Sequence, residues 1–134
     1  MEMDQAMIVA GIGCRRGAGA PDIEAAIRTA LARAGVTTAD LKAIATGNAK
    51  AAEAGIAAAA AKLGISLILI PDDALKIAGA RTVTRSERVF ALTGAPSLAE
   101  AAALAAAGPS SRLIASRLVF GAATCALARS GAAP

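Results

Sequence analysis

The fold is decided by the stretch MIVAGIGCRRGAG, residues 7–19, with Pro21 and Asp22 shortly after it. The apolar residues 7–10 predict a first strand, and the glycines that follow predict a turn over residues 11–19. A proline and then a carboxylate are typical of the first turn of a helix, where a missing N–H is tolerated and a negative charge suits the helix dipole. Strand, glycine-rich turn and helix together indicate the start of an α/β fold.

Strands and helices continue to alternate along the rest of the chain. Strands are expected at 7–10, 43–46, 67–70, 113–117 and 124–128, and the longer helices at 21–34, 51–63 and 98–107. The strand at 67–70 is apolar on both faces, which predicts a place in the middle of a parallel sheet. A short helix after Pro71 is expected to turn Leu75 and Ile77 inward. The predicted fold is one domain over residues 1–134, a three-layer α/β/α sandwich with a mostly parallel or mixed sheet of about five strands.

The composition excludes several kinds of site. None of the 134 residues is histidine, which removes both histidine-activated nucleophiles and histidine-ligated metal sites. Aromatic residues make up 1% of the chain, which argues against stacking on nucleic-acid bases. The 14 basic residues exceed the 10 acidic ones by only four, and they are scattered. We therefore expect no nucleic-acid partner and no metal site.

The hydropathy of the chain comes from alanine. The mean hydropathy is +0.58, yet no run approaches the roughly 20 apolar residues of a membrane span, so no membrane partner is expected. The first residues lack the pattern of a signal peptide, which predicts a cytoplasmic protein. Cys14 and Cys125 are accordingly expected as reduced thiols.

The glycine-rich turn differs from nucleotide-binding loops. Three residues rather than two separate Gly13 from Gly17, no acidic residue ends the second strand, and the lysine of a phosphate-binding loop is missing. The turn offers backbone N–H groups together with the adjacent guanidiniums of Arg15 and Arg16, a combination that favours a carboxylate or a phosphate. The alternative is a tight turn whose arginines point into water.

Four short motifs occur in order along the chain. They are GIGCRRG at 11–17, a T-x-x-x-K-x-x-E-x-G pattern on Thr46, Lys50, Glu53 and Gly55, then Thr93-Gly94 with Ser97 and EAAAL at 100–104, and finally TCALAR at 124–129. Together they resemble the CobE / CbiG C-terminal domain family of cobalamin biosynthesis. One departure concerns the last segment, where the family commonly has a lysine and this chain has Arg117, which keeps the positive charge but not the amine.

The resemblance implies a compact α/β domain that acts in corrin-ring synthesis. In the longer members this domain is the C-terminal part of the cobalt-precorrin-5A hydrolase, which opens a lactone and releases acetaldehyde. The stand-alone members belong to the oxygen-dependent pathway. Two interpretations stay open: an enzyme of hydrolytic type that acts on a precorrin, and a carrier that holds a corrinoid intermediate without chemistry. Other enzymes of the corrin pathway are candidate partners.

The chemistry of corrin precursors agrees with the basic turn, because many carboxylates surround their large apolar ring. We predict that the ligand is contacted by Gly11, Gly13, Cys14, Arg15, Arg16, Gly17, Thr46, Arg117 and Thr124. Glu53 is the expected general base, with Lys50 beside it, since a hydrolase without histidine has to use a carboxylate, a lysine or bound water. No cofactor is expected.

Several of these residues also have a structural interpretation. Lys50 and Glu53 are three residues apart and would pair on the surface of a helix. Cys14 would be a small buried residue beneath the turn, and Cys125 a part of the core. Ser97 and Glu100 are expected to form a capping box at the start of a helix.

Overall fold

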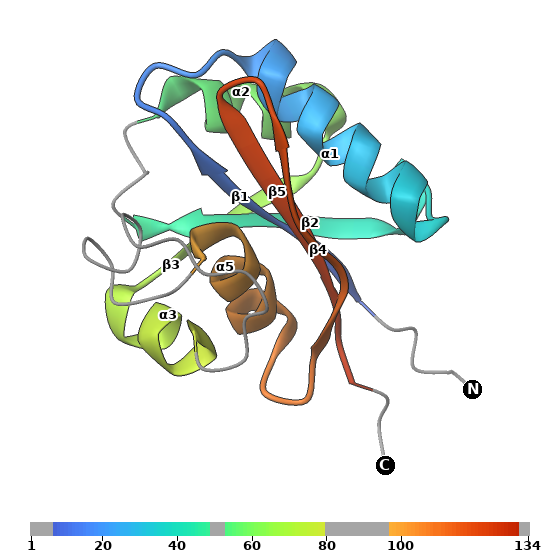
Figure 1. Cartoon of the computed structure of the whole chain (residues 1–134), viewed down its shortest axis with the longest axis vertical. Helices are drawn as coiled ribbons and strands as arrows, with labels where there is room; N and C mark the ends of the chain where they lie inside the picture. Colours follow the sequence, from blue (N-terminus) through green and yellow to red (C-terminus); the bar gives the residue numbers. More distant parts are fainter. Residues whose placement is uncertain (1–6, 49–52, 80–96, 132–134) are drawn as a thin grey trace.

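The computed structural model describes residues 7–48, 53–79 and 97–131, and their centre is a five-stranded mixed sheet (Figure 1). The strands are β1 (Ile8–Cys14), β2 (Leu41–Gly47), β3 (Ser66–Ile70), β4 (Arg112–Phe120) and β5 (Ala123–Arg129), in the order β3-β2-β1-β5-β4. The first three strands run parallel, whereas β5 is antiparallel to both of its neighbours. The sheet therefore combines parallel crossovers with a C-terminal hairpin.

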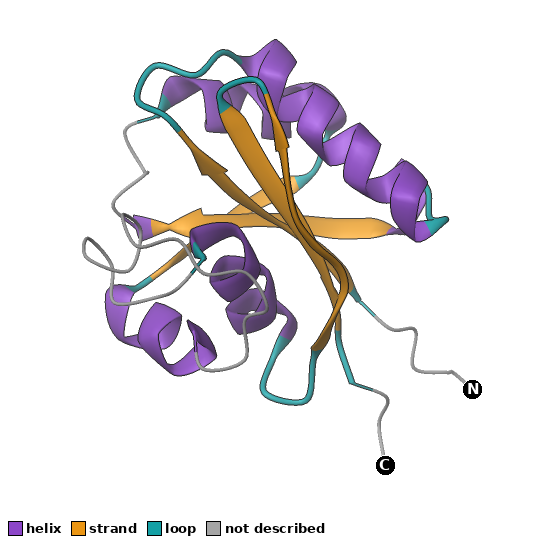
Figure 2. Ribbon diagram, in the orientation of Figure 1, coloured by secondary structure: helices purple, strands orange, loops and turns teal. Residues whose placement is uncertain are grey.

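Helices cover both faces of the sheet (Figure 2). They are α1 (Ala20–Ala34), α2 (Ala54–Leu63), α3 (Asp72–Gly79) and α5 (Leu98–Ala107), with a short 3-10 turn at Thr38–Asp40. The first two helices pack on one face, and α3 and α5 pack on the other. This arrangement confirms the predicted three-layer α/β sandwich. No helix in the described part of the chain is long and apolar enough to cross a membrane.

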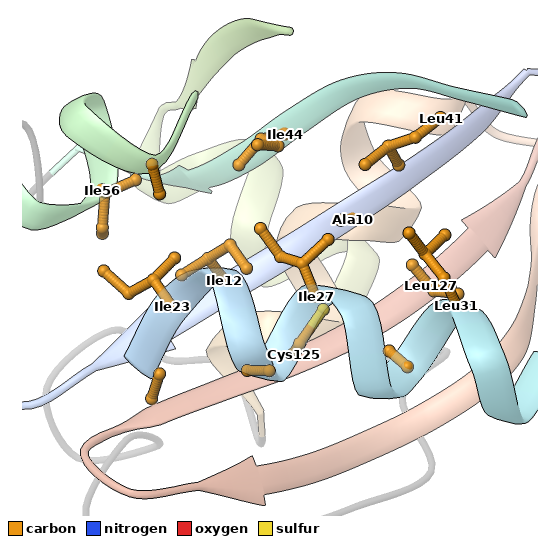
Figure 3. Close-up of a cluster of buried hydrophobic side chains, with 14 of the residues drawn as sticks. Ala10, Ile12, Ile23, Ile27, Leu31, Leu41, Ile44, Ile56, Cys125 and Leu127 are labelled. Atoms are coloured by element: carbon orange, nitrogen blue, oxygen red, sulfur yellow. The ribbon is translucent and has the colours of Figure 1, made fainter. Parts of the chain in front are cut away.

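The larger part of the core lies between α1, α2 and the sheet (Figure 3). Ile23, Ile27 and Leu31 form the inner stripe of α1, as their spacing of four residues predicts. They pack on Ile12 of β1 and Leu127 of β5, which are fully buried. Burial of each such side chain contributes on the order of 1.5–3 kcal/mol to folding. The second core, on the α5 face, is built mainly from alanines.

The strand β1 is longer than predicted and includes half of the expected turn. Gly11 and Gly13 lie in the strand, and the turn itself begins after Cys14. A Cβ atom on Gly11 would overlap the carbonyl oxygen of Ala99 in α5. Gly11 therefore allows the backbone of α5 to come close to the sheet, which is a common reason for glycine inside a strand.

Three further expectations were wrong in detail. The strand β3 lies at an edge of the sheet rather than in its middle, and Leu69 is 39% exposed. Ile77 on α3 is 77% exposed, while Leu75 is buried as predicted. The helix α2 begins at Ala54 instead of residue 51, with Glu53 as its N-cap. An apolar run alone does not separate an edge strand from a central one, because it does not show which helices cover it.

Candidate functional site

The turn after β1, residues 15–19, lies beside the tip of the β4–β5 hairpin at one end of the sheet (Figure 1). The backbone N–H of Arg15 donates to the carbonyl oxygen of Ala122 over 2.9 Å. The N–H of Ala18 donates to the carbonyl of Arg15 over 3.1 Å, which closes the turn. Two segments more than 100 residues apart are thus joined where the candidate anion site was predicted.

The first turn of α1 strengthens this junction. Asp22 Oδ2 accepts a hydrogen bond from the backbone N–H of Ala122 over 3.1 Å. The preceding Gly121 has φ of 57°, and a Cβ atom there would lie 2.5 Å from Asp22 Oδ2. The carboxylate predicted to favour the helix start therefore also holds the tip of the hairpin.

The start of α2 is hydrogen-bonded to the other side of the turn. Glu53 Oε1 accepts a hydrogen bond from the backbone N–H of Gly17 over 2.9 Å. A Cβ atom on Gly55 would overlap the carbonyl oxygen of Ala18, so glycine is needed for α2 to approach this closely. Glu53 and Gly55, two members of one sequence motif, both act on the glycine-rich turn. Lys50 lies outside the described residues.

Thr46 lies inside the fold and is fully buried. Its Oγ1 donates to the carbonyl oxygen of Ile12 over 2.7 Å. The last paired residues of β1 and β2 are Gly11 and Ala45. The Thr46 side chain therefore adds a hydrogen bond between the two strands one residue beyond their backbone pairing. The structure thus gives the Thr46 hydroxyl a partner within the protein, between the strands that carry the two motifs.

Arg15 and Arg16 are both exposed. Neither forms an ion pair with another described residue. Their backbone is held by the hairpin on one side, and the following Gly17 is held by α2 on the other. Two adjacent cations are therefore presented to solvent on a fastened turn, which lowers the entropy lost when a ligand binds there.

A second group of predicted residues lies on the face of the sheet that α5 covers. A Cβ atom on Gly13 would lie 2.6 Å from Thr124 Oγ1 and 3.8 Å from Leu98 of α5, so Thr124 faces this helix. Thr124 is half-buried and pairs with Val119 on β4. Arg117, also half-buried, lies two residues earlier on the same strand. Thr124 is two residues from Ala122, which accepts the hydrogen bond from Arg15, so Thr124 lies near the glycine-rich turn.

Glu100 was expected only as part of a capping box, but its side chain also contacts β4. Its backbone N–H donates to Ser97 Oγ over 3.4 Å, which is the expected half of a capping box. Its carboxylate reaches β4, where Oε2 accepts from the N–H of Arg117 over 2.8 Å. The side chain is fully buried, and β4 is irregular between Ala115 and Leu118. Serine followed by glutamate predicts the cap, but nothing in that spacing indicates a partner on a distant strand.

The two cysteines differ in environment. Cys14 is half-buried at the end of β1 and packs against the core below α1. Cys125 is fully buried, and burial raises the pKa of its thiol far above the usual value. Within residues 7–48, 53–79 and 97–131, no three cysteine and carboxylate side chains lie close enough together to hold a metal ion.

The structure therefore divides the predicted site residues into three sets. Arg15, Arg16 and Gly17 form the fastened turn, with Glu53 bonded to it. Arg117 and Thr124 lie on the β4–β5 hairpin, where Thr124 pairs with Gly13 just before the turn. The remaining described members, Gly11, Gly13, Cys14 and Thr46, belong to the strands beneath and pack or bond within the fold.

Comparison with known proteins agrees with this arrangement. Residues 8–128 match the family described as Cobalamin synthesis G C-terminus. Protein CobE of Sinorhizobium sp is 39% identical over 121 residues, which are 90% of this chain and 79% of that protein. The family match covers the glycine-rich turn, the motif on Thr46, Lys50, Glu53 and Gly55, and nearly all of the final hairpin.

Solved structures show the same fold. The crystal structure of CobE, a protein from the cobalamin (vitamin B12) biosynthetic pathway, matches with a TM-score of 0.87 and 33% identity over 92% of this chain and 90% of that one. The cobalamin biosynthesis protein chiG from Agrobacterium tumefaciens str. C58 matches with a TM-score of 0.75 and 44% identity over 93% and 99% of the two chains. Sequence and structure agree that this chain belongs to the CbiG C-terminal and CobE family of cobalamin biosynthesis proteins.

Proposed function

We propose that this protein binds a precorrin-type tetrapyrrole by the carboxylates around its ring. The observation that carries the proposal is the fastened turn, which presents the neighbouring guanidiniums of Arg15 and Arg16 at the carboxyl end of β1. Guanidinium groups bind carboxylates through paired hydrogen bonds. Arg117 and Thr124, on the adjacent hairpin, would supply a further cation and a hydroxyl group. Family membership supports a tetrapyrrole as the source of the carboxylates.

Hydrolysis is the second candidate function, and the position of Glu53 favours it. Its carboxylate is bonded to Gly17, next to the two arginines, so a bound ligand would lie near a carboxylate. In this reaction Glu53 takes a proton from water while the oxygen attacks a lactone carbonyl. The ring C–O bond then breaks, and the proton passes to the leaving oxygen to give an acid and an alcohol. Lys50 would stabilise the negative charge that develops on the carbonyl oxygen.

The binding proposal is tested by titrating the protein with cobyrinic acid, a corrin whose side-chain carboxylates are free, and following the absorbance of the ring. We expect the Arg15→Ala/Arg16→Ala double variant to bind at least tenfold more weakly, because two charge-assisted contacts are lost. Arg28→Ala/Arg33→Ala is the matched control, since it removes two exposed arginines of α1 and changes the net charge equally. Equal affinities for the two double variants would overturn the proposal.

The mass of the pigment after incubation distinguishes simple binding from hydrolysis. Purified protein is incubated with lactone-bearing precorrin intermediates made by the preceding enzymes, and the pigment is then analysed. Hydrolysis is established by a mass gain of one water, or by the net loss of C2H2 that results when acetaldehyde is also released, provided that Glu53→Gln abolishes the change. Release of unchanged pigment from a stable complex establishes a carrier.

A further inference from the structure

The β4–β5 hairpin exposes apolar side chains beside the basic turn. Four large hydrophobic residues are notably exposed in the described part of the chain: Leu69, Ile77, Val119 and Phe120. Val119 and Phe120 end β4, close to Ala122, which accepts the hydrogen bond from Arg15. Leu69 and Ile77 belong to β3 and α3, at the opposite edge of the sheet.

Val119 and Phe120 lie on opposite faces of the hairpin. Phe120 pairs with Ala123, which belongs to the core below α1. Val119 pairs with Thr124, and Thr124 faces α5 because a Cβ atom on Gly13 would meet both Thr124 and Leu98. Val119 is nevertheless 61% exposed, so α5 leaves the outer end of this face uncovered. At this uncovered end, the apolar side chain of Val119 lies beside the hydroxyl group of Thr124, and Arg117 is two residues before Val119 on β4.

We propose that Val119 is a specificity-determining contact that holds the apolar face of the tetrapyrrole ring, on the α5 side of the hairpin. This inference rests on the proposed function and adds to it the place of the ring. The ligand and this surface are complementary, because the ligand has an apolar centre and a carboxylate rim. The protein has an exposed apolar residue with Arg117 on the same strand and Arg15 bonded to the same hairpin.

Glu100 gives this part of the hairpin a fixed shape. Its buried carboxylate accepts a hydrogen bond from the N–H of Arg117 over 2.8 Å, within the irregular part of β4 between Ala115 and Leu118. Arg117 and Val119 are therefore presented by a strand segment that is anchored to α5. An anchored segment loses little freedom when a ligand covers it, so its apolar area contributes to affinity with a small entropic penalty.

The test compares Val119→Ser with Val119→Ile by titration with cobyrinic acid. We expect about five- to tenfold weaker binding for the serine variant, because apolar area covered by the ring is lost, and unchanged or tighter binding for the isoleucine variant. Butanetetracarboxylate, a polyanion without a ring, should have the same inhibition constant for both variants, so it should displace the corrin more readily from the serine variant, whose corrin affinity is lower. Ile77→Ser is the matched control, since it also removes an exposed aliphatic side chain, on α3.

The outcomes distinguish this inference from the binding proposal. If the Arg15→Ala/Arg16→Ala variant is weakened while Val119→Ser binds like the unaltered protein, only the placement of the ring is overturned. If Phe120→Ala weakens corrin binding and Val119→Ser does not, the ring lies on the opposite face of the hairpin and the inference is wrong. An unaltered protein that does not bind cobyrinic acid overturns both proposals. Far-ultraviolet circular dichroism and thermal unfolding show that each variant is folded.

Discussion

Glu53 and Gly17 lie 36 residues apart in the sequence and are joined by a hydrogen bond of 2.9 Å from the glycine N–H to the carboxylate. This bond ties the N-cap of α2 to the turn after β1. It makes the geometry of the arginine-bearing turn depend on a second crossover of the fold. Glu53, the candidate general base, is therefore also a structural contact of the turn, and its catalytic and structural roles require separate experiments.

Glu53→Ala should destabilise the protein by about 0.5–1.5 kcal/mol, because the Gly17 N–H loses its acceptor at an exposed position. It should also weaken cobyrinic acid binding, since the turn becomes less ordered. Glu53→Gln keeps an oxygen acceptor and should retain most of the stability. Urea unfolding measures the free energy of unfolding for both variants. Equal stability of the alanine variant and the unaltered protein would contradict the anchoring role.

Gly55→Ala is expected to cost more than 2 kcal/mol of unfolding free energy, about the range of severe overpacking. The added Cβ would overlap the carbonyl oxygen of Ala18, and neither backbone can move without disturbing the turn. Gly19→Ala is the control, because its φ is −80° and the nearest atom to a new Cβ is 3.5 Å away. Its free energy of unfolding should change by less than about 1 kcal/mol, because the weaker N-cap preference of alanine opposes the entropic gain from replacing glycine. Similar thermal midpoints for the two variants would refute the close-approach argument.

Much of the fold was predictable from local patterns. The spacing of Ile23, Ile27 and Leu31 predicted the buried face of α1, and Gly35 predicted its end, which the structure confirms with φ of 73°. The place of β3 in the sheet was not predictable in this way. Strand order depends on contacts between distant segments, and an apolar run such as residues 67–70 is compatible with a central or an edge position.

The candidate site was predicted less completely than the fold. Adjacent arginines after a strand indicate the basic turn, because parallel strands present such turns at their carboxyl ends. The bonds from Glu53 to Gly17 and from Glu100 to Arg117 join residues that are distant in the sequence. Without the topology, Glu100 appears only as the third residue of a helix, where a carboxylate needs no further explanation. Whether these residues contact a ligand remains a prediction for the titrations above.

Thr46→Val should destabilise the protein by about 1–3 kcal/mol. The change keeps the shape of the side chain but leaves the buried carbonyl oxygen of Ile12 without the donor that lies 2.7 Å from it. Thr46→Ser restores the hydroxyl and should recover part of the loss, apart from the missing methyl group. Chemical denaturation of the three proteins checks the order. A valine variant as stable as the threonine form would show that the hydrogen bond contributes nothing measurable.

Cysteine alkylation should distinguish the two thiols. Burial raises the pKa of the Cys125 thiol, so less of the reactive thiolate exists at any pH, and the side chain is also inaccessible. With N-ethylmaleimide at pH 8 we expect Cys14 to be modified at least tenfold faster than Cys125. Mass spectrometry of the digested protein measures both rates. In urea the rates should become similar, whereas rapid native labelling of Cys125 would contradict its burial.

The position of β5 between β1 and β4 has a consequence for how the protein is made. The sheet interior is completed by residues 123–129, and β4 touches the rest of the sheet only through them. While the ribosome still encloses this segment, β1 has one unpaired edge and the nascent chain cannot close its sheet. Closure of the sheet interior therefore depends on residues 123–129, and until they pair with β1 its open edge can pair with other chains.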